Sequence, residues 1–341
     1  MKAVALISGG LDSILAERLI KDQGIEVICL NFRIPFCHRG KEITSAKNTN
    51  LEIIEDNLSE KLKVVDISEG LLKLLENPRH GFGSNMNPCI DCKILMLSKA
   101  KQLMQELGAQ FIVTGEVLGQ RPMSQHRDAL QAIAKKSGLE GLVLRPLSAK
   151  NLPETIPEIN NWVNRDKLLN FGGRTRRPQI ELAAKFGIRN FAWPAGGCLL
   201  TEPEFSKRLK EIIARKELNI ENVALLKIGR HFRIGKTTKL IVGRNELEDI
   251  ELEKLAKAGD YLFYPNQQLA GPTCLGKGEF NEALIKLAAQ ITCRYCDLNT
   301  AVSTEIMYVI KTRGTVLCGD SPSCFLRVSP LSETELVSLR I

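Results

Sequence analysis

The stretch "AVALISGGLDSILAERLIKDQGIEVICLNF" (residues 3–32) decides the fold of the first part of this chain. Its first five residues are continuously apolar and end in Ser-Gly-Gly, as expected for a buried parallel strand that enters a tight turn. Apolar residues then recur at helical spacing up to Gly24, and a second apolar run covers 25–32. These segments predict a strand, a helix and a second, parallel strand, with a glycine-rich turn after the first strand.

Strands and helices continue to alternate over the first 200 residues. We expect strands at 61–67, 110–116 and 142–148, and helices at 42–56, about 92–107 and 153–163, with 177–188 continuing the series. This alternation predicts a doubly wound, mostly parallel α/β sheet with sites at the carboxyl ends of its strands.

The pattern changes near residue 200. A charged amphipathic helix is expected over 202–217. The predicted strands that follow are "VALLKIG" (223–229), "HFRIG", "TKLIVGR", "DYLFYP", "MYVIKTRG" and "TVLCG" (315–319), with helices at about 246–258 and 279–291. We therefore predict an α/β domain over 1–205, a helical linker over 206–220 and a smaller α+β domain over 221–341.

The composition is that of a soluble protein of two domains. Of the 341 residues, 44% are hydrophobic and 25% are charged, which allows a sizeable core. The apolar run near the N-terminus is too short for a signal peptide, and no segment approaches a membrane span. We expect a cytoplasmic protein without a membrane partner, whose ten cysteines serve metal binding or catalysis more than disulfides.

The net charge of +8 is unevenly distributed. The densest basic segment is "GGRTRRP" (172–178), and residues 226–244 carry six basic residues and no acid. Such clusters suit a polyanion, because each neutralised phosphate releases counterions, although a solvated basic surface gives the same pattern. The candidate RNA-binding residues are Arg174, Arg176, Arg177, Arg230, Arg233 and Lys236.

The segment "SGGLDS" (Ser8–Ser13), which we call the phosphate loop, has the features of an anion-binding turn. Its glycines let backbone amides face outward, and the following helix N-terminus adds positive potential. It has neither the lysine of a P-loop nor the G-x-G-x-x-G of a dinucleotide fold. Asp12 would repel phosphate unless a cation lies between them, so it suggests Mg²⁺. A purely structural glycine turn is the alternative.

Cysteines form three groups along the chain. "NPCIDC" (87–92) has metal-ligand spacing, and Cys89 and Cys92 could bind zinc, act as a redox pair or hold an iron–sulfur cluster. Cys198, in "WPAGGCLLT", follows a predicted strand, where α/β sites gather. In the second domain a further metal site could use Cys293, Cys296, Cys318 and Cys324, although isolated small hydrophobic residues are the default.

"SGGLDS" after a first strand resembles the PP-loop of the N-type ATP pyrophosphatases, which have the adenine nucleotide alpha hydrolase-like fold, cleave ATP between the α and β phosphates and adenylate a substrate. "TGEVLGQ" (114–120) and "LVLRPLSAK" (142–150) look like the tRNA-thiolating branch, which is close to ThiI and more loosely similar to MnmA. The resemblance covers about residues 1–205.

This resemblance implies roles for particular residues. The residues implied to hold the leaving pyrophosphate are Ser8, Gly9, Gly10, Asp12 and Ser13. Leu30 and Phe32, at the end of the second strand, would border the adenine, and Gly115 would lie near the adenylate with Gln120 and Arg145 close by. Without the motif match, Gln120 and Arg145 would be interpreted as ordinary surface residues.

The cysteines match an iron–sulfur-dependent subgroup of this branch. In that subgroup three thiolates, here Cys89, Cys92 and Cys198, hold a [4Fe–4S] cluster with one iron open to sulfide. A cluster-free version remains open, in which Cys198 or Cys89 carries a persulfide and the other cysteine resolves a disulfide. The expected catalytic residues are Asp12, Cys89 and Cys198.

Residues 237–278 resemble the NFACT-R domain of ribosome quality-control proteins that contact tRNA. The usual tryptophan and histidine after the helix are replaced by Leu262 and Tyr264, so the match is partial. Because no THUMP-like domain precedes the first strand, we expect this domain and residues 172–178 to dock tRNA.

Three functions follow as hypotheses. The leading one is an ATP-dependent tRNA sulfurtransferase that adenylates the carbonyl of a tRNA uridine or cytidine, with uridine as the expected base, and releases pyrophosphate before sulfur is inserted. The others are a PP-loop enzyme that adenylates a small molecule and an RNA-binding protein with a degenerate ATP site. Expected partners are ATP, Mg²⁺, tRNA and a sulfur donor, either sulfide or a cysteine desulfurase. A second copy of the chain, in a homodimer, is a further candidate.

Overall fold

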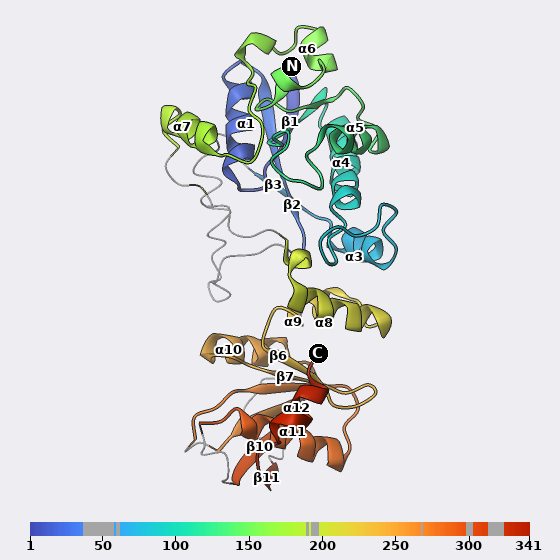
Figure 1. The fold of residues 1–341 in the computed structure, drawn as a ribbon, viewed down its shortest axis with the longest axis vertical. Helices are drawn as coiled ribbons and strands as arrows, with labels where there is room; N and C mark the ends of the chain where they lie inside the picture. The colour runs from blue at the N-terminus through green and yellow to red at the C-terminus, as the bar shows by residue number, and fades with distance from the viewer. Residues whose placement is uncertain are drawn as a thin grey trace. The chain divides into compact units, whose positions relative to one another are not determined.

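The structure is a computed structural model that describes residues 1–36, 58, 62–188, 191, 198–266, 269–297, 303–312 and 324–341. The described residues divide into two compact units, the first ending at Pro203 and the second beginning at Glu204 (Figure 1). The helix expected at 42–56, the strand expected at 315–319 and Cys318 lie outside the described residues. Within them, the helices are all too short or too polar to cross a membrane.

The first unit contains a five-stranded parallel sheet. Its strands are β1 (Lys2–Leu6), β2 (Glu26–Arg33), β3 (Lys63–Asp66), β4 (Phe111–Thr114) and β5 (Val143–Leu144). Their order is β3-β2-β1-β4-β5, and all neighbouring strands run parallel. The predicted α/β fold class is therefore confirmed.

Helices cover both faces of this sheet because β1 is apolar on both. Ala3 and Ala5 pack in one core with α1 (Leu11–Lys21) and α7 (Arg177–Lys185). Val4 packs on the other face with α4 (Cys89–Glu106) and α5 (Arg127–Lys136), and α3 (Ser68–Glu76) contacts α4. Strand order reverses at β1, which lies between β2 and β4. In such sheets the crevice beyond the carboxyl ends at this reversal is the usual ligand site.

The sequence-based boundaries differ from the structure in several places. The helix expected at 153–163 is a single turn, α6 (Ile156–Ile159), because Asn161 has a φ of 56° that a helix does not allow. Helix α4 begins at Cys89, earlier than expected, and α3 and α5 were not predicted. Three short 3-10 turns complete the unit: η1 (Ala149–Asn151), η2 (Arg165–Lys167) and η3 (Leu199–Thr201).

The second unit is a six-stranded antiparallel sheet in the order β11-β10-β8-β9-β7-β6. Its strands are β6 (Arg230–Arg233), β7 (Lys239–Val242), β8 (Tyr261–Pro265), β9 (Cys274–Lys277), β10 (Thr304–Ile310) and β11 (Cys324–Val328). Its helices are α8 (Pro203–Ala214), α9 (Ile220–Leu225), α10 (Glu246–Leu255), α11 (Glu282–Arg294) and α12 (Glu333–Leu339). Helices α9 and α10 pack in one apolar cluster with the sheet, and α11 and α12 pack in the other.

The strand expected at 223–229 is wrong, because α9 occupies its first three residues and residues 226–229 form turns and bends. The Asn219 side chain accepts a hydrogen bond from the Asn222 amide and so begins the helix. Val223 and Leu226 are fully buried. A short apolar run does not distinguish a buried strand from a buried helix, and here the capping residue was the missed signal.

Candidate active site

The phosphate loop connects β1 to α1 and is curled back on itself. Gly9 has a φ of 84°, which favours glycine. The Ser13 hydroxyl donates to the Gly10 carbonyl at 2.7 Å and accepts from the Ser8 amide at 3.2 Å. Gly10 is the N-cap of α1 and provides no side-chain cap. The first amides of α1 are therefore not used by a capping side chain, which suits an anion.

Gly115 brings a second loop against the phosphate loop. A Cβ atom at Gly115 would lie 2.5 Å from both the carbonyl carbon of Asp12 and the backbone nitrogen of Ser13. Only glycine permits this approach, so the loop after β4 packs directly on the first turn of α1. The loops after β1 and β4 thus meet at the point where the strand order reverses.

Asp12 is the centre of the polar contacts in this crevice. Its Oδ2 atom accepts from Gln120 Nε2 at 3.0 Å and lies 3.7 Å from Arg176 Nη2. Among the described residues, Asp12 Oδ1 and Gln120 Oε1 are buried without a hydrogen-bond partner. Burial raises the pKa of Asp12, while Arg176, Gln120 and Arg121 act to lower it. Unpartnered oxygens of this kind fit Mg²⁺, whose preferred ligands are oxygens.

Arg176 reaches Asp12 from the segment that was predicted to bind RNA. Arg174 is exposed, and the side chain of Arg177 is 86% exposed and pairs with Glu181 at 2.9 Å. The three arginines of this segment therefore occupy different environments, and only Arg176 among them contacts the phosphate loop.

Leu30, Phe32 and Arg145 lie deeper than an exposed nucleotide contact would. Leu30 is 1% exposed and Phe32 packs against the same apolar core. Arg145 is 7% exposed, and its Nε lies 3.0 Å from Glu116 Oε2. The structure thus gives Leu30 and Arg145 a packing role, and their proposed nucleotide contacts stay predictions.

Glu116 is a buried carboxylate that sequence reasoning missed. Lys93 Nζ lies 3.2 Å from its Oε1, and Thr114 donates to its Oε2 at 3.2 Å. Burial alone would raise the pKa of Glu116, but Lys93 and Arg145 lower it to about 2. Because Lys93 follows the cysteine pair, this ion cluster connects the β4 loop with the start of α4.

Cys89 and Cys92 occupy the first turn of α4. Both are half-buried, and Cys89 is the first helical residue after Pro88. Burial raises the pKa of Cys89, whereas a hydrogen bond from Asn87 and the charges of Arg121 and Lys93 oppose that rise. A helix N-terminus also favours thiolate over thiol.

Cys198 begins a short segment that is bound to the loop before this cysteine pair. Two hydrogen bonds, of 3.0 and 2.7 Å, join residues 198–201 to residues 85–86. A third, of 2.9 Å, joins the same segment to Phe36 beyond the end of β2. In the part of the chain that the structure describes, however, no three His, Cys, Asp or Glu side chains are grouped closely enough to hold a metal ion. The three cysteines thus belong to connected segments without forming a ready metal site.

Asp91, inside the cysteine pair, has an unpredicted partner. Its carboxylate accepts from the His80 backbone amide at 2.8 Å and contacts His80 Nδ1 at 2.6 Å. Lys136 contacts the other ring nitrogen of His80. Asp91 is 7% exposed, so it joins α4 to the loop that precedes it and to α5. An aspartate in the first turn of a helix was the available sequence signal.

The cysteines of the second domain have a different environment. Cys293 and Cys296 lie in an apolar core, and Cys296 Sγ contacts the Thr292 carbonyl at 3.3 Å. Burial raises the pKa of Cys296 to about 12. Cys324 is exposed on β11. Within the described residues, the second metal site is therefore not assembled.

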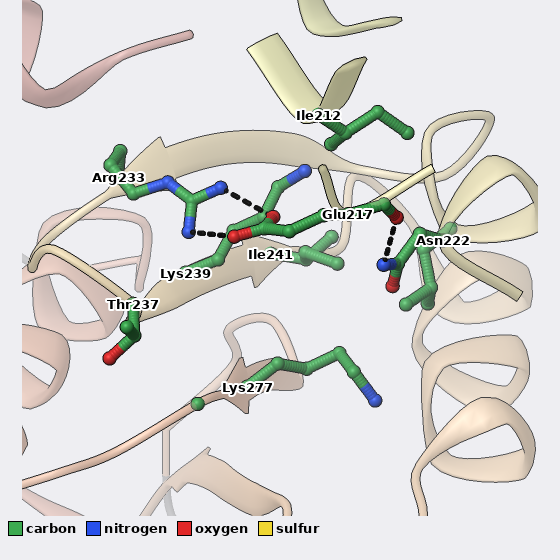
Figure 2. Close-up of a pocket in the computed structure, with 10 residues that line it drawn as sticks. Ile212, Glu217, Asn222, Arg233, Thr237, Lys239, Ile241 and Lys277 are labelled. Atoms are coloured by element: carbon green, nitrogen blue, oxygen red, sulfur yellow. Dashed lines mark hydrogen bonds and ion pairs between the residues drawn. The ribbon is translucent and has the colours of Figure 1, made fainter. Parts of the chain in front are cut away.

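The basic residues predicted to bind RNA in the second domain are largely engaged. Figure 2 shows Arg233 paired with Glu217 beside a pocket of about 180 Å³, at an Nη2–Oε2 distance of 2.9 Å. Glu211 lies 2.7 Å from the same nitrogen. Arg230 lies over the Tyr295 ring, with its central guanidinium carbon 4.9 Å from the centroid. Lys236 alone among the three is exposed.

Comparisons with known proteins find matches to two separate parts of the chain. Residues 1–159 match the family described as thiamine biosynthesis protein (ThiI), and residues 229–320 match the NFACT protein RNA binding domain. A probable tRNA sulfurtransferase of Thermococcus kodakarensis is 27% identical over 159 residues, which are 46% of this chain and 39% of that protein. The tRNA-specific 2-thiouridylase MnmA of Helicobacter hepaticus is 31% identical over 119 residues, which are 34% of this chain and 34% of that protein.

Among solved structures, a 4-thiouridine synthetase in complex with RNA and ATP is 20% identical, with a TM-score of 0.38 over 65% of this chain and 53% of that chain. The chain spans less than two fifths of the length of the two curated relatives. The family matches nevertheless confirm both resemblances inferred from the motifs. Residues 1–159 of this chain are therefore similar to the ThiI family, and residues 229–320 are similar to the NFACT RNA binding domain.

Proposed function

We propose that the chain is an ATP-dependent tRNA sulfurtransferase. The observation that carries this proposal is a set of contacts between the two parts of the site: Gly115 packs against Asp12, and Glu116, the next residue, lies 3.2 Å from Lys93 Nζ. Because Lys93 follows Cys92, the loop after β4 connects the phosphate loop to the cysteine pair. Activation of a carbonyl by ATP and delivery of sulfur to the same carbon require such proximity.

In the first step, the carbonyl oxygen of a tRNA uridine or cytidine would attack the α-phosphorus of ATP, and pyrophosphate would leave. The phosphate loop residues Ser8, Gly9, Gly10 and Ser13 would hold the departing phosphates through backbone amides and hydroxyls. Asp12 and Gln120, whose buried oxygens Oδ1 and Oε1 have no hydrogen-bond partner among the described residues, would hold Mg²⁺, which would neutralise charge on the phosphates. Adenylation turns the oxygen into part of AMP, a good leaving group.

In the second step, sulfur replaces AMP at the activated carbon. We propose that the thiolates of Cys89, Cys92 and Cys198 hold a [4Fe–4S] cluster, which would supply an iron able to carry sulfide. The hydrogen bonds between 198–201 and 85–86 support this choice of ligands. Among the described residues, these three thiols are not grouped closely enough to hold a metal ion.

A cluster-free route uses the same cysteines. One of Cys89 and Cys198 would receive a persulfide from a cysteine desulfurase, and its terminal sulfur would attack the carbon as AMP leaves. The other thiolate would then break the sulfur–sulfur bond, which frees the thiolated base and leaves a disulfide for an external thiol to reduce.

For tRNA docking we propose the second domain together with exposed residues of the basic segments. Arg174, Arg177 and Lys236 are exposed and would contact phosphates. The description of the matching domain as RNA-binding supports this proposal. Arg233 is less suited, because two glutamates already neutralise it.

The test is thiolation in vitro with anaerobically purified full chain, ATP, Mg²⁺ and unmodified tRNA, with either sulfide or a cysteine desulfurase and its substrate cysteine as the sulfur donor. Nucleoside mass spectrometry should detect a thionucleoside, and pyrophosphate release should depend on tRNA. Cys198→Ala should abolish thiolation, whereas Cys324→Ala, which changes an exposed cysteine on β11, should not. Brown, iron-containing wild type would support the cluster, and full activity in colourless, iron-free protein would support the persulfide route. Absence of any thionucleoside under both conditions would contradict the proposal.

A further inference from the structure

We propose that Arg176 is a positioning residue that binds Asp12 before nucleotide arrives and the phosphates of ATP afterwards, in exchange with the divalent cation. This inference rests on the proposed function, since it assigns a role within the same nucleotide site. Arg176 was expected to bind RNA, and no motif of the resemblance includes it.

The Asp12 carboxylate is shared between Gln120 and Arg176. Gln120 and Arg176 both approach Oδ2, at 3.0 and 3.7 Å, and within the described residues Oδ1 is buried without a partner. The distance to Arg176 is that of an ion pair without a short hydrogen bond. Arg176 thus offsets the charge of Asp12 while leaving one carboxylate oxygen for another ligand.

Backbone hydrogen bonds hold the segment of Arg176 beside the loop that carries Gln120. The Gly173 amide donates to the Leu118 carbonyl at 2.8 Å, and Leu118 and Gly172 form a parallel bridge. Arg176 is the N-cap residue of α7, which packs against α1. Arg176 and Gln120 are therefore carried on two segments that are hydrogen-bonded to each other. The backbone of Arg176 is thus held in place beside the segment of Gln120.

A buried serine strengthens this connection. The Ser148 side chain is fully buried, donates to the Phe171 carbonyl at 2.6 Å and accepts from the Leu118 amide at 2.9 Å. Ser148 belongs to "LVLRPLSAK", so this motif joins the loop of Gln120 to the segment of Arg176. The motif thereby acts on the site through these two segments without touching Asp12.

The charges at the site also favour this exchange of partners by Arg176. A carboxylate that faces a triphosphate needs a cation beside it, and before nucleotide binds the guanidinium supplies that charge. When a divalent cation occupies Asp12, the guanidinium is repelled by the cation and attracted by phosphate oxygens, for which its planar donor geometry is well suited. Arg176 would then neutralise charge on the pyrophosphate as it leaves.

This exchange predicts effects of opposite sign on two ligands. In the full chain, Arg176→Met should weaken ATP binding, measured by equilibrium dialysis with Mg²⁺, by roughly 10-fold, as expected for one lost charge-assisted contact. The same variant should bind Mn²⁺ alone, counted by electron paramagnetic resonance, severalfold more tightly than wild type, because its competitor is gone. A merely structural arginine would weaken both.

Two further variants make the experiment decisive. Lys185→Met, which changes an exposed residue at the other end of α7, should alter neither affinity, and Arg176→Lys should restore part of the ATP affinity and the competition with Mn²⁺. Unchanged ATP affinity, or Mn²⁺ affinity that is equal or lower in Arg176→Met, would overturn the inference. Either result leaves the proposed function standing if wild type thiolates tRNA, whereas failure of wild type to release pyrophosphate would reject the proposed function by itself.

Discussion

The two Cys-x-x-Cys pairs of this chain have identical spacing and opposite settings. Cys89 and Cys92 begin α4 and are half-buried, and the charges of Arg121 and Lys93 act to lower the pKa of Cys89. Cys293 and Cys296 lie at the end of α11 and just after it, buried in an apolar core. A helix N-terminus favours thiolate, whereas a C-terminus and an apolar core disfavour it. Spacing alone therefore does not identify a reactive cysteine pair.

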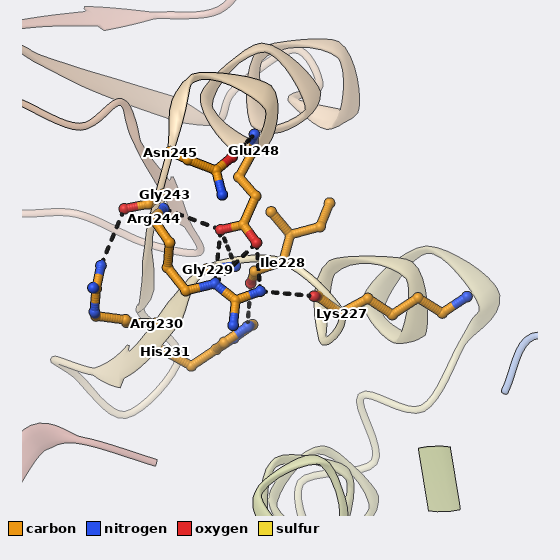
Figure 3. A network of polar contacts seen from close by, with 9 residues as sticks. All are labelled: Lys227, Ile228, Gly229, Arg230, His231, Gly243, Arg244, Asn245 and Glu248. Atoms are coloured by element: carbon orange, nitrogen blue, oxygen red, sulfur yellow. Dashed lines mark hydrogen bonds and ion pairs between the residues drawn. The ribbon is translucent and has the colours of Figure 1, made fainter. Parts of the chain in front are cut away.

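Two carboxylates at helix N-termini show the same contrast. Glu248 in the second domain accepts from the Gly229 amide at 3.1 Å, from the Arg244 amide at 3.0 Å and from Arg244 Nε at 2.9 Å (Figure 3). Asp12 keeps a buried oxygen without a partner among the described residues. A satisfied carboxylate stabilises the fold, and an unsatisfied one indicates a ligand site.

Substitutions in the two cysteine pairs should give the largest effect, which is a loss of thiolation activity. Cys89→Ala should lower thiolation by roughly 1000-fold or more, because a group that carries sulfur has no substitute. Cys296→Ala should keep activity and lower the free energy of unfolding by about 1 kcal/mol, as for a buried methyl-sized deletion. Thionucleoside yield and urea unfolding measure the two outcomes, and a loss of activity in folded Cys296→Ala would break the comparison.

Substitution of the buried carboxylate Glu116 should give the next largest effect, which is a loss of stability. Glu116→Gln should lower the free energy of unfolding of the first domain by about 3 kcal/mol, since it leaves Lys93 and Arg145 without their shared anion. The pKa of Glu116 is held at about 2, below its ordinary 4.5, so its contribution is present above pH 4.5 and lost as pH falls toward 2. The deficit of the variant, measured by denaturant unfolding, should shrink in that window. A deficit that does not change with pH would contradict this.

Substitution of Asp249 should give the smallest effect, and it should raise the stability where the Glu116 substitution lowers it. Burial raises the pKa of Asp249 to about 6 from 3.8, although its Oδ1 accepts from the Thr273 amide at 3.1 Å. A raised pKa favours folding below the unfolded value, and that contribution is lost as pH rises through about 6. Asp249→Asn keeps the acceptor, so it should stabilise the second domain by about 1 kcal/mol near neutral pH, after allowance for its exposure. Thermal unfolding should show no gain in acid, and an equal gain at both pH values would refute the assignment.

Several elements could be predicted because their signals are local. The apolar runs of β1 and β2, the glycines of the phosphate loop and the periodicity of α1 lie within 33 residues and need no distant contact to be recognised. The strand expected at 223–229 failed for the complementary reason, since a short buried run has no period of its own and only the Asn219 cap separates helix from strand.

The sequence by itself determined the parallel sheet, the phosphate loop and the residues with reactive chemistry, because periodicity and residue type are properties of neighbours along the chain. Only the tertiary structure decided which charges meet. Arg176 lies beside Asp12, which is 164 residues earlier in the sequence. Arg233 is neutralised by two glutamates that lie outside its own basic segment. Pairing across such separations depends on how the elements pack, and a local pattern does not contain that information.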